Sequence, residues 1–448
     1  MKKKILKLKT RPRIIDMGRA TPLLAAQADF NAAFSAIGES LIDRDVPLEA
    51  IKLALLTKSH VMLNGKHGLA KSLLADRVFE AISGDPVVYK EMMMKSTQIE
   101  QVFGPPKIER FQKEAVWEFN TENMLPDAQF AFIDEVYRAP ATVLPAMLRL
   151  LNERDFRNAG TWHKCPLMTA IGTTNFVTDD EELDAFHDRW LFRLEVRPVS
   201  TLQRRLLMLS KALAPEEPPT TFSLMQLAEL QESVAEVIVP DTIQEVLCEL
   251  FSALQKQLEG GKLFISDRRL VQTLRVLQAE CLSRATPEQL TARDEPLTVT
   301  LDHLSACRFT FIEAGNSEAD AAYDTVFGTL IGQRQKQEAE EGEIVSLEEL
   351  VSRFQGRLGG RTLSEKVRQQ MIADCEQVRL SLTADPSQGG VKGISSDAGK
   401  NRLARLATKV EDILLELRSA NDAILSNPAT AAQVSFTSTN VRYTAPKV

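Results

Sequence analysis

The residues best suited to chemistry lie first in a glycine-containing loop, Asn64–Ser72, which reads NGKHGLAKS. Main-chain N–H groups of such a loop, when a helix follows it, point toward an anion. Lys71 would then reach the β- and γ-phosphates of a nucleotide, and the Ser72 hydroxyl would bind Mg²⁺. The spacing G-x-x-x-x-G-K-S/T holds from Gly65, except that Ala70 replaces the last glycine. We expect alanine to be tolerated there if its φ angle is negative. The alternative is an ordinary glycine turn before an amphipathic helix.

The loop supplies most of the expected nucleotide-binding residues, namely Gly65, Lys66, His67, Gly68, Leu69, Ala70, Lys71 and Ser72. We interpret His67 as a loop residue near phosphate rather than a metal ligand, because no second His or Cys sits at ligand spacing.

A second group of candidates ends an apolar run, Ala128–Glu135, which reads AQFAFIDE. The carboxyl ends of parallel strands converge on the ligand crevice of an open sheet, so we expect Asp134 near Ser72. Asp134 would hold Mg²⁺ through water, and Glu135 would polarise the water that attacks the γ-phosphate. Either acid could instead cap a helix. The metal and base roles are favoured because the Lys71 loop precedes these acids.

Further polar candidates follow along the chain. Asn175 ends a later apolar run, where its amide could contact the γ-phosphate or position the water; the alternative is a turn residue. Arg189 and Arg193 lie four residues apart, and either could stabilise charge on a neighbouring subunit's γ-phosphate. Structural salt bridging is the alternative for both. Arg268 and Arg269 open a helix, from which an arginine could contact nucleotide as part of a lid.

The elements that must position these residues alternate short apolar runs with helical patterns from about residue 20 to 197, as βα units do. The predicted strands are His60–Asn64, Gln129–Asp134, Leu167–Thr173 and Leu191–Val196, and helices are predicted at Pro47–Thr57 and Leu73–Ile82. These strands are short and apolar, as suits parallel strands covered on both faces. From about residue 198 to 330 the periodicity is helical, with Leu202–Leu213 and Ile243–Leu258 as examples.

The region beyond residue 330 is also predicted to be helical. Gln333–Glu349 is rich in glutamine and glutamate, and we favour a helix over a linker there. Two further helices flank the loop Pro386–Lys400. The second has the alternating spacing of a coiled-coil seam, at Leu403, Leu406, Val410, Ile413, Leu417, Ala420 and Ile424. The first, through Val367–Leu382, could complete a helical hairpin. Ordinary bundle packing is favoured over partner docking.

Composition limits the class of protein. The 448-residue chain is 44% hydrophobic and 26% charged, so it can bury a substantial core. Its formal charge of −7 argues against a globally basic nucleic-acid binder, although the arm Met1–Arg13 is basic. That arm lacks the apolar run of a secretory signal, and no apolar stretch approaches the roughly 20 residues that cross a bilayer. The five cysteines are scattered, which is typical of reduced thiols, so we expect a cytoplasmic protein.

Taken in order, the motifs resemble the AAA+ ATPases, specifically the MoxR family and its RavA-like branch, over residues 20–310. The resemblance rests on Lys71-Ser72, Asp134-Glu135, Asn175, Asp188-Arg189 and Ser266-Asp267-Arg268, with support from Leu150–Asn158 and Gln101–Pro105. The predicted fold class is α/β: an AAA+ parallel-sheet nucleotide-binding core over residues 1–197, an α-helical lid over 198–330 and a helical C-terminal extension over 331–448. The extension has no match within the resemblance.

The resemblance also implies roles for these positions. It implies Walker A at Gly65–Ser72, Walker B at Asp134 with catalytic Glu135, sensor 1 at Asn175, a trans arginine finger at Arg189 with Arg193 as its rival, and sensor 2 at Arg268 with Arg269 as its rival. Lys66 and His67 stand where the family commonly has two prolines, so a different loop rigidity is expected. The implied cofactors are ATP/ADP and Mg²⁺, with Ser72 and Asp134 as metal ligands.

The function predicted on this basis is ATP hydrolysis in a ring, hexameric as in the family, that remodels a protein partner. The resemblance points to a von Willebrand A-domain protein as that partner. One alternative is an ATPase that acts on nucleic acid or in a defence system, which the acidic total charge disfavours. Another is a nucleotide-gated assembly protein with little turnover, which the intact pair Asp134-Glu135 disfavours.

Overall fold

The computed structural model describes residues 17–175, 188–213, 218–258, 265–292, 295–313, 315–358, 365–383 and 396–425. The chain divides into two compact units, residues 1–328 and 329–448. The predicted boundary between core and lid, at 197–198, falls inside the first unit and stays a prediction. None of the helices in the described ranges combines the length and the apolar character that crossing a membrane requires.

The first unit is built on a five-stranded parallel sheet with the order β3-β4-β7-β1-β8. Its strands are β1 (Val61–Asn64), β3 (Val88–Met92), β4 (Phe130–Asp134), β7 (Thr169–Thr174) and β8 (Phe192–Glu195). Asn64 at the end of β1 is the register partner of Thr174 in β7 and of Glu195 in β8. Because all five strands run parallel, their carboxyl ends meet at one edge, which carries the Asn64–Ser72 loop and Asp134.

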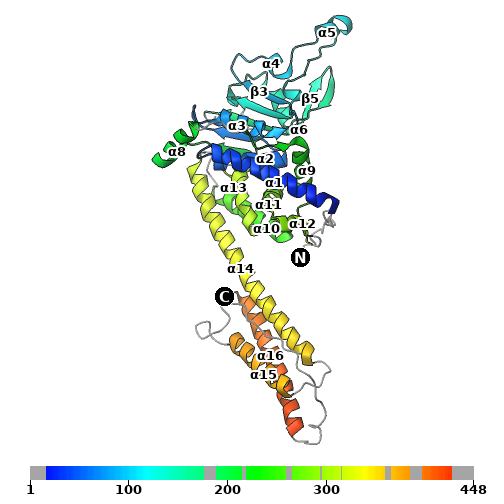
Figure 1. The fold of residues 1–448 in the computed structure, drawn as a ribbon, viewed down its shortest axis with the longest axis vertical. Helices are drawn as coiled ribbons and strands as arrows, with labels where there is room; N and C mark the ends of the chain where they lie inside the picture. The colour runs from blue at the N-terminus through cyan, green and yellow to red at the C-terminus, as the bar shows by residue number, and fades with distance from the viewer. Residues whose placement is uncertain are drawn as a thin grey trace. The chain divides into compact units, whose positions relative to one another are not determined.

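Helices cover this sheet and extend the first unit (Figure 1). Those described are α1 (Met17–Ser40), α2 (Asp45–Thr57), α3 (Lys71–Glu80), α4 (Ile99–Phe103), α5 (Ile108–Glu114), α6 (Leu144–Glu153), α8 (Leu202–Ala212), α9 (Leu224–Val234), α10 (Asp241–Gln257), α11 (Asp267–Arg284), α12 (Pro287–Thr291) and α13 (Cys307–Phe311), with short 3-10 helices η1 (Leu125–Asp127), η2 (Val136–Arg138) and η3 (Leu301–Ala306). Two small sheets pair β2 (Ile82–Ser83) with β9 (Phe222–Ser223) and β5 (Asp155–Asn158) with β6 (Thr161–Lys164).

The side chains of β4 alternate between two apolar layers, as a strand covered on both faces requires. On one face Phe79 of α3 packs against Phe130, with 5.9 Å between the ring centroids. On the other face Ala131 and Ile133 join a buried cluster that includes Met147 of α6. The α/β fold is therefore confirmed, and β4 holds its terminal acids at the edge of a rigid, doubly covered sheet.

The four predicted strands are confirmed as β1, β4, β7 and β8, and the helices predicted in the first unit are confirmed as α2, α3, α8 and α10. The sequence analysis missed β3, an edge strand whose sequence VYKEM is too polar for the apolar-run criterion. It also missed the β5–β6 hairpin. The hairpin turn is Ala159-Gly160, where both residues have positive φ angles of 49° and 81°, as a two-residue turn requires.

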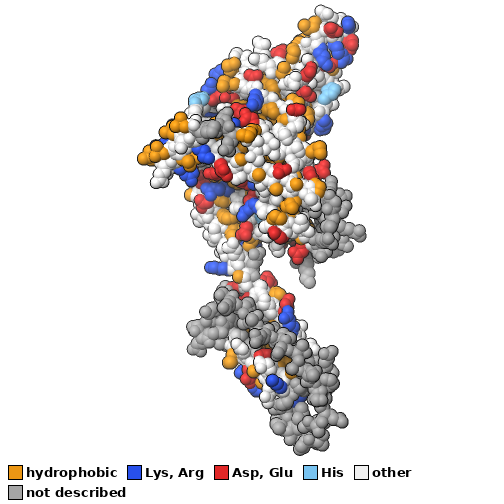
Figure 2. Space-filling model, viewed as in Figure 1, with side chains coloured by type: hydrophobic (Ala, Val, Ile, Leu, Met, Phe, Trp, Pro, Cys, Tyr) orange, Lys and Arg blue, Asp and Glu red, His pale blue; other side chains and the backbone are white. Residues whose placement is uncertain are grey.

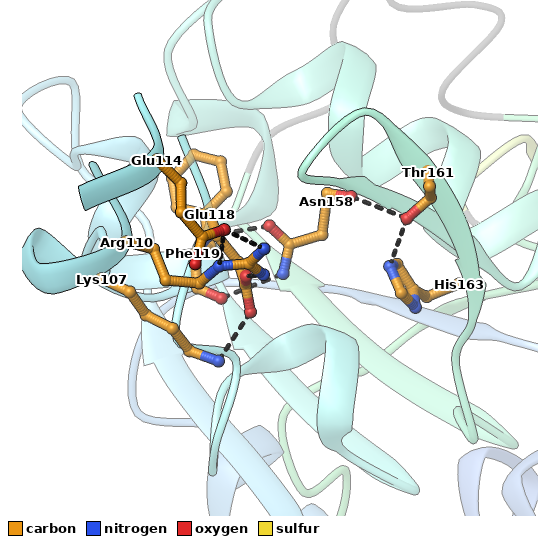
Figure 3. A network of polar contacts seen from close by, with 8 residues as sticks. All are labelled: Lys107, Arg110, Glu114, Glu118, Phe119, Asn158, Thr161 and His163. Atoms are coloured by element: carbon orange, nitrogen blue, oxygen red, sulfur yellow. Dashed lines mark hydrogen bonds and ion pairs between the residues drawn. The ribbon is translucent and has the colours of Figure 1, made fainter. Parts of the chain in front are cut away.

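The β5–β6 hairpin is fixed to the segment that follows α5 (Figure 3). The Asn158 side chain accepts a hydrogen bond from the Phe119 main-chain N–H at 2.8 Å and donates one to the Phe119 carbonyl at 2.9 Å. Beside this link, Glu118 forms ion pairs with Lys107, at 2.7 Å, and with Arg110. These contacts make the hairpin and the α5 segment one connected projection from the core.

The helices of the C-terminal region are α14 (Ser317–Leu358), α15 (Glu365–Thr383) and α16 (Asp397–Leu425). They share one buried cluster, made by Val351, Phe354, Met371, Cys375, Leu406, Val410, Ile413, Leu414 and Leu417. Helices α15 and α16 thus lie where the two helices of the hairpin were predicted, and the end of α14 adds a third helix to their cluster. Ala420 and Ile424 of the predicted seam, and the basic arm Met1–Arg13, lie outside the side chains that the structure describes.

Candidate functional site

The candidate phosphate loop connects β1 to α3, as predicted. Two of its residues adopt the left-handed backbone conformation. Gly68 and Ala70 have φ angles of +77° and +59°. The condition under which alanine was expected to be tolerated, a negative φ at Ala70, is therefore not met: alanine here adopts the conformation that glycine adopts freely, at a cost of about 1–2 kcal/mol. At Gly65 a side chain is excluded outright, because an added Cβ would lie 2.6 Å from the Val196 carbonyl oxygen.

Lys71 begins α3 and is 8% exposed. Its Nζ donates to the main-chain carbonyl of Thr174 at 3.3 Å and to that of Gly65. Burial lowers the pKa of Lys71, and the charges of Glu135 and Asp134 oppose that shift. The ammonium group therefore lies within the electrostatic reach of both acids, at the edge where β1, β4 and β7 end.

The two acids at the end of β4 are held by β7. An Asp134 oxygen, Oδ1, accepts hydrogen bonds from the Thr173 hydroxyl and from the Glu135 main-chain N–H, the latter at 3.1 Å. Glu135 has a φ of +51° and is only 5% exposed. Its carboxylate lies 3.5 Å from the Arg138 Nε. A nearly buried carboxylate in a turn after a strand is a suitable general base once a water reaches it.

Asn175 joins this group through the loop. Its Nδ2 lies 2.6 Å from His67 Nε2, and the Nδ1 of the same imidazole lies 3.6 Å from Glu135 Oε1. The structure therefore brings together the loop with its Lys71, the acid pair and Asn175, which come from three separate stretches of sequence.

The donors at this edge fit a magnesium ion. The Ser72 hydroxyl, in the first turn of α3, and the Asp134 carboxylate are hard oxygen donors, and Mg²⁺ is usually held by one or two protein groups plus waters and phosphate oxygens. The first turn of α3 also points unpaired N–H groups toward an anion.

Two of the candidate arginines are committed to structural contacts. Arg193 of β8 is buried and forms an ion pair with Glu313. Arg269 is buried and donates to the main-chain carbonyls of Trp190 at 3.1 Å and Thr310 at 2.9 Å. Burial lowers the pKa of Arg193, and it lowers the pKa of Arg269 to about 9. These contacts argue against Arg193 as a group offered to another subunit and against Arg269 as a nucleotide ligand.

The start of α11, which carries Arg268, lies beside the segment that leads into β8. The Ser266 hydroxyl donates to Asp188 at 3.2 Å, and Arg269 donates to the Trp190 carbonyl at 3.1 Å. Because β8 runs parallel to β1, this segment lies at the edge of the sheet opposite the Asn64–Ser72 loop. Arg189 lies at the same edge, since its neighbour Asp188 accepts a hydrogen bond from Ser266 at 3.2 Å.

Sequence reasoning missed two contributors to the site, Thr173 and Arg138. Thr173 belongs to the run Thr173-Thr174-Asn175, and its place two residues before Asn175 was a usable signal, because a strand adjacent to β4 must present one side chain to the acid pair. Arg138 gave no signal, since its approach to Glu135 depends on the short helix η2.

Comparison with known proteins adds the following. Residues 28–233 match the sequence model of the MoxR domain in the MoxR-vWA-beta-propeller ternary systems. Similar curated proteins include Uncharacterized protein MJ0079 of Methanocaldococcus jannaschii, 29% identical over 237 residues, which are 53% of this chain and 60% of that protein. Uncharacterized protein MJ0812 of the same organism is 27% identical over 240 residues, which are 53% of this chain and 61% of that protein.

Chaperone MoxR1 of Mycobacterium tuberculosis is 25% identical over 248 residues, covering 54% of this chain and 64% of that protein. The chain thus spans less than two thirds of the length of each of these relatives. The crystal structure of "a putative ATPase from Cytophaga hutchinsonii" superimposes with a TM-score of 0.54 at 16% identity, covering 70% of this chain and 96% of that one. That likeness shows a shared fold.

Proposed function

We propose that this chain, whose residues 28–233 match the MoxR-domain model, is a MoxR-family AAA+ ATPase that hydrolyses ATP and uses the energy to remodel a protein partner. The observation that carries the proposal is the convergence of Lys71, Asp134 and Glu135 at one edge of the parallel sheet, where Lys71 donates to the Thr174 carbonyl and Asp134 accepts from the Thr173 hydroxyl. A cation, a metal-binding acid and a nearly buried acid at a glycine loop are the groups that phosphoryl transfer to water requires.

In the proposed reaction the loop N–H groups and Lys71 hold the phosphates. Ser72 and Asp134 are the residues that would hold Mg²⁺, which would supply positive charge to offset that of the phosphates. Glu135 accepts a proton from the attacking water as the water oxygen forms a bond to the γ-phosphorus. The bond from that phosphorus to the bridging oxygen breaks, and ADP leaves with the electron pair. Asn175, beside Glu135, orients the water or the γ-phosphate.

The arginine geometry supports a ring, which we propose to be hexameric. Arg189 and the start of α11, which carries Arg268, lie at the edge of the sheet opposite their own phosphate loop. An arginine on that edge can stabilise transition-state charge only in the site of another copy. We therefore propose Arg189 as the trans finger, with Arg268 as a second contact to the neighbour's nucleotide.

The matched model describes MoxR domains that act in systems with von Willebrand A-domain and β-propeller proteins. We propose a von Willebrand A-domain protein as the remodelled partner, and the RavA-like branch as the subgroup, the latter on motif resemblance alone. The described cysteines are free and, except for Cys248, buried, which supports a reducing compartment such as the cytoplasm.

A trapped ATP complex tests the partner assignment. The Glu135→Gln variant should keep ATP bound and hold its partner, so affinity purification from cells with ATP should recover a von Willebrand A-domain polypeptide. Wild-type protein under the same conditions, and the variant after ATP removal, serve as controls. Recovery of nucleic acid in place of that polypeptide would contradict the proposal.

A further inference from the structure

The phosphate loop carries an imidazole between the two polar groups expected to handle the attacking water. His67 Nε2 lies 2.6 Å from Asn175 Nδ2, and His67 Nδ1 lies 3.6 Å from Glu135 Oε1. The His67 side chain is 71% exposed, whereas the Glu135 side chain is 6% exposed. One ring thus reaches from the solvent side of the loop to the nearly buried carboxylate and to the end of β7.

The hydrogen-bond chemistry of this arrangement is directional. The Asn175 amide nitrogen is a donor, so the Nε2 that it faces must accept, and a neutral imidazole then carries its hydrogen on Nδ1. That N–H faces the Glu135 carboxylate. With the amide reversed, a neutral ring would turn a bare Nδ1 lone pair toward the same carboxylate, which is repulsive. The neutral ring therefore favours one orientation of both Asn175 and Glu135.

The two carboxylate oxygens of Glu135 face different neighbours. Its Oε2, which His67 does not face, makes no hydrogen bond to any residue within the described part of the chain. The charged groups around it are Arg138, whose Nε lies 3.5 Å from Oε2, and Lys71 and Asp134 at the same strand edge. Arg138 is half-exposed on the short helix η2, so solvent screening weakens its ion pair with the Glu135 carboxylate. His67 supplies the neighbour on the Oε1 side.

From this geometry we infer that His67 is a positioning residue, which fixes the Glu135 carboxylate and the Asn175 amide relative to each other and to the phosphate loop. The inference rests on the proposed ATPase function. His67 transfers no proton to substrate in this account; it acts through Glu135 and Asn175. Because misplacing a catalytic group by about 1 Å can cost up to about a hundredfold in rate, a residue that holds two of them affects turnover more than binding.

The test compares three variants of the full chain by steady-state ATP hydrolysis. His67→Ala removes both contacts, and we expect kcat to fall about tenfold while KM for ATP stays within about twofold. His67→Gln keeps an acceptor and a donor on one amide, without a titrating ring, and should restore most of the wild-type kcat. His163→Ala, which removes an exposed histidine of the β5–β6 hairpin, is the matched control and should match wild type.

A second measurement separates positioning from a general loosening of the loop. In the Glu135→Gln background, His67→Ala should lower the single-turnover rate by clearly less than the tenfold expected in the wild-type background, because the carboxylate is gone and only the Asn175 contact is left to lose. The inference is overturned if His67→Ala keeps the wild-type kcat, if it raises KM alone, if His67→Gln is as slow as His67→Ala, or if the losses add fully. If wild type and His163→Ala also fail to hydrolyse ATP, the proposed function itself has failed.

Discussion

The Lys71 ammonium donates to the main-chain oxygen of Thr174 at 3.3 Å, although 103 residues separate the two along the chain. The contact exists because β1 and β7 are neighbours, with Asn64 opposite Thr174 in register. It ties the start of α3 to the residue that immediately precedes Asn175. A ligand that draws Lys71 toward phosphate therefore acts on the end of β7 as well, which links nucleotide binding to the Asn175 position.

Subunit mixing tests the proposed completion of one site by a neighbour. Lys71→Ala should abolish nucleotide binding in its own site but still offer Arg189, whereas Arg189→Ala should bind ATP but lack the trans contact. Each variant alone should lose at least about a hundredfold in kcat, since a trans arginine contributes 10³–10⁵ in related chemistry. A mixture of the two should recover measurable ATPase activity. Mixtures that stay as inactive as the separate variants would contradict the trans assignment.

Relief of backbone strain tests the phosphate-loop geometry. Ala70→Gly should raise the free energy of unfolding by about 0.5–1 kcal/mol, because glycine adopts the observed φ of +59° without the left-handed penalty. Ala75→Gly, in the interior of α3, the helix that Ala70 precedes, is the control. It should lower the free energy of unfolding by about 1 kcal/mol or more. Denaturant unfolding measures both. A destabilising Ala70→Gly would show that the left-handed conformation is not adopted.

Because of His60, we expect the free energy of unfolding to depend on pH in the acid range. Its Nδ1 accepts from the Ala170 N–H and its Nε2 contacts the Leu151 carbonyl, each at 2.9 Å, so the neutral ring is fully paired. Burial lowers its pKa well below the ordinary 6.5. Below pH 6.5 the His60 ring binds a proton in the unfolded chain but not in the folded chain. The contribution of His60 to the free energy of unfolding is therefore complete above pH 6.5, and it is lost as the pH falls, by up to about 1.4 kcal/mol per pH unit.

His60→Gln removes that titration while keeping an amide donor and acceptor. The free energy of unfolding, measured at pH 7.5 and 5.5, should therefore fall more steeply for wild type than for the variant, by about 1 kcal/mol or more across the interval. Parallel pH dependence in the two proteins would show that His60 is protonated normally in the folded state.

The helical cluster of the second unit can be tested with two leucines of α16. Leu417 is 1% exposed within the cluster, whereas Leu415 is 73% exposed. Leu417→Ala should destabilise this unit by about 2–5 kcal/mol and speed amide hydrogen exchange in α15 and α16. Leu415→Ala should stay within about 0.5 kcal/mol of wild type. Equal effects of the two substitutions would mean that the cluster is not formed as described.

Much of the fold was predictable because the central strands have a clear sequence signal. The runs that became β1, β4, β7 and β8 are apolar and end in Gly, acid or Asn, so both the sheet and the edge carrying the site follow from the sequence. The edge strand β3 (Val88–Met92) escaped detection since its exposed face admits charged residues. The Asn158–Phe119 link was beyond prediction, because it joins segments 39 residues apart through side-chain geometry.

The candidate site was predictable in its residues and less so in its geometry. The order of Lys71, Asp134 and Asn175 placed each at a strand end, and parallel strands bring such ends together. The φ angle of Ala70 could not be read from composition, because loop closure onto α3 decides it. The side on which Arg268 lies depends on how α11 packs against α2, which local periodicity does not encode.

The most direct test of the account is ATP turnover by wild type and Glu135→Gln, with nucleotide affinity measured on the same preparations. The account predicts Mg²⁺-dependent hydrolysis by wild type, a loss of at least about a hundredfold in kcat for Glu135→Gln, and an ATP Kd for the variant within about threefold of wild type. Equal turnover by the two proteins, or no ATP binding by either, would contradict the assignment of the Lys71, Asp134 and Glu135 edge as an ATPase site.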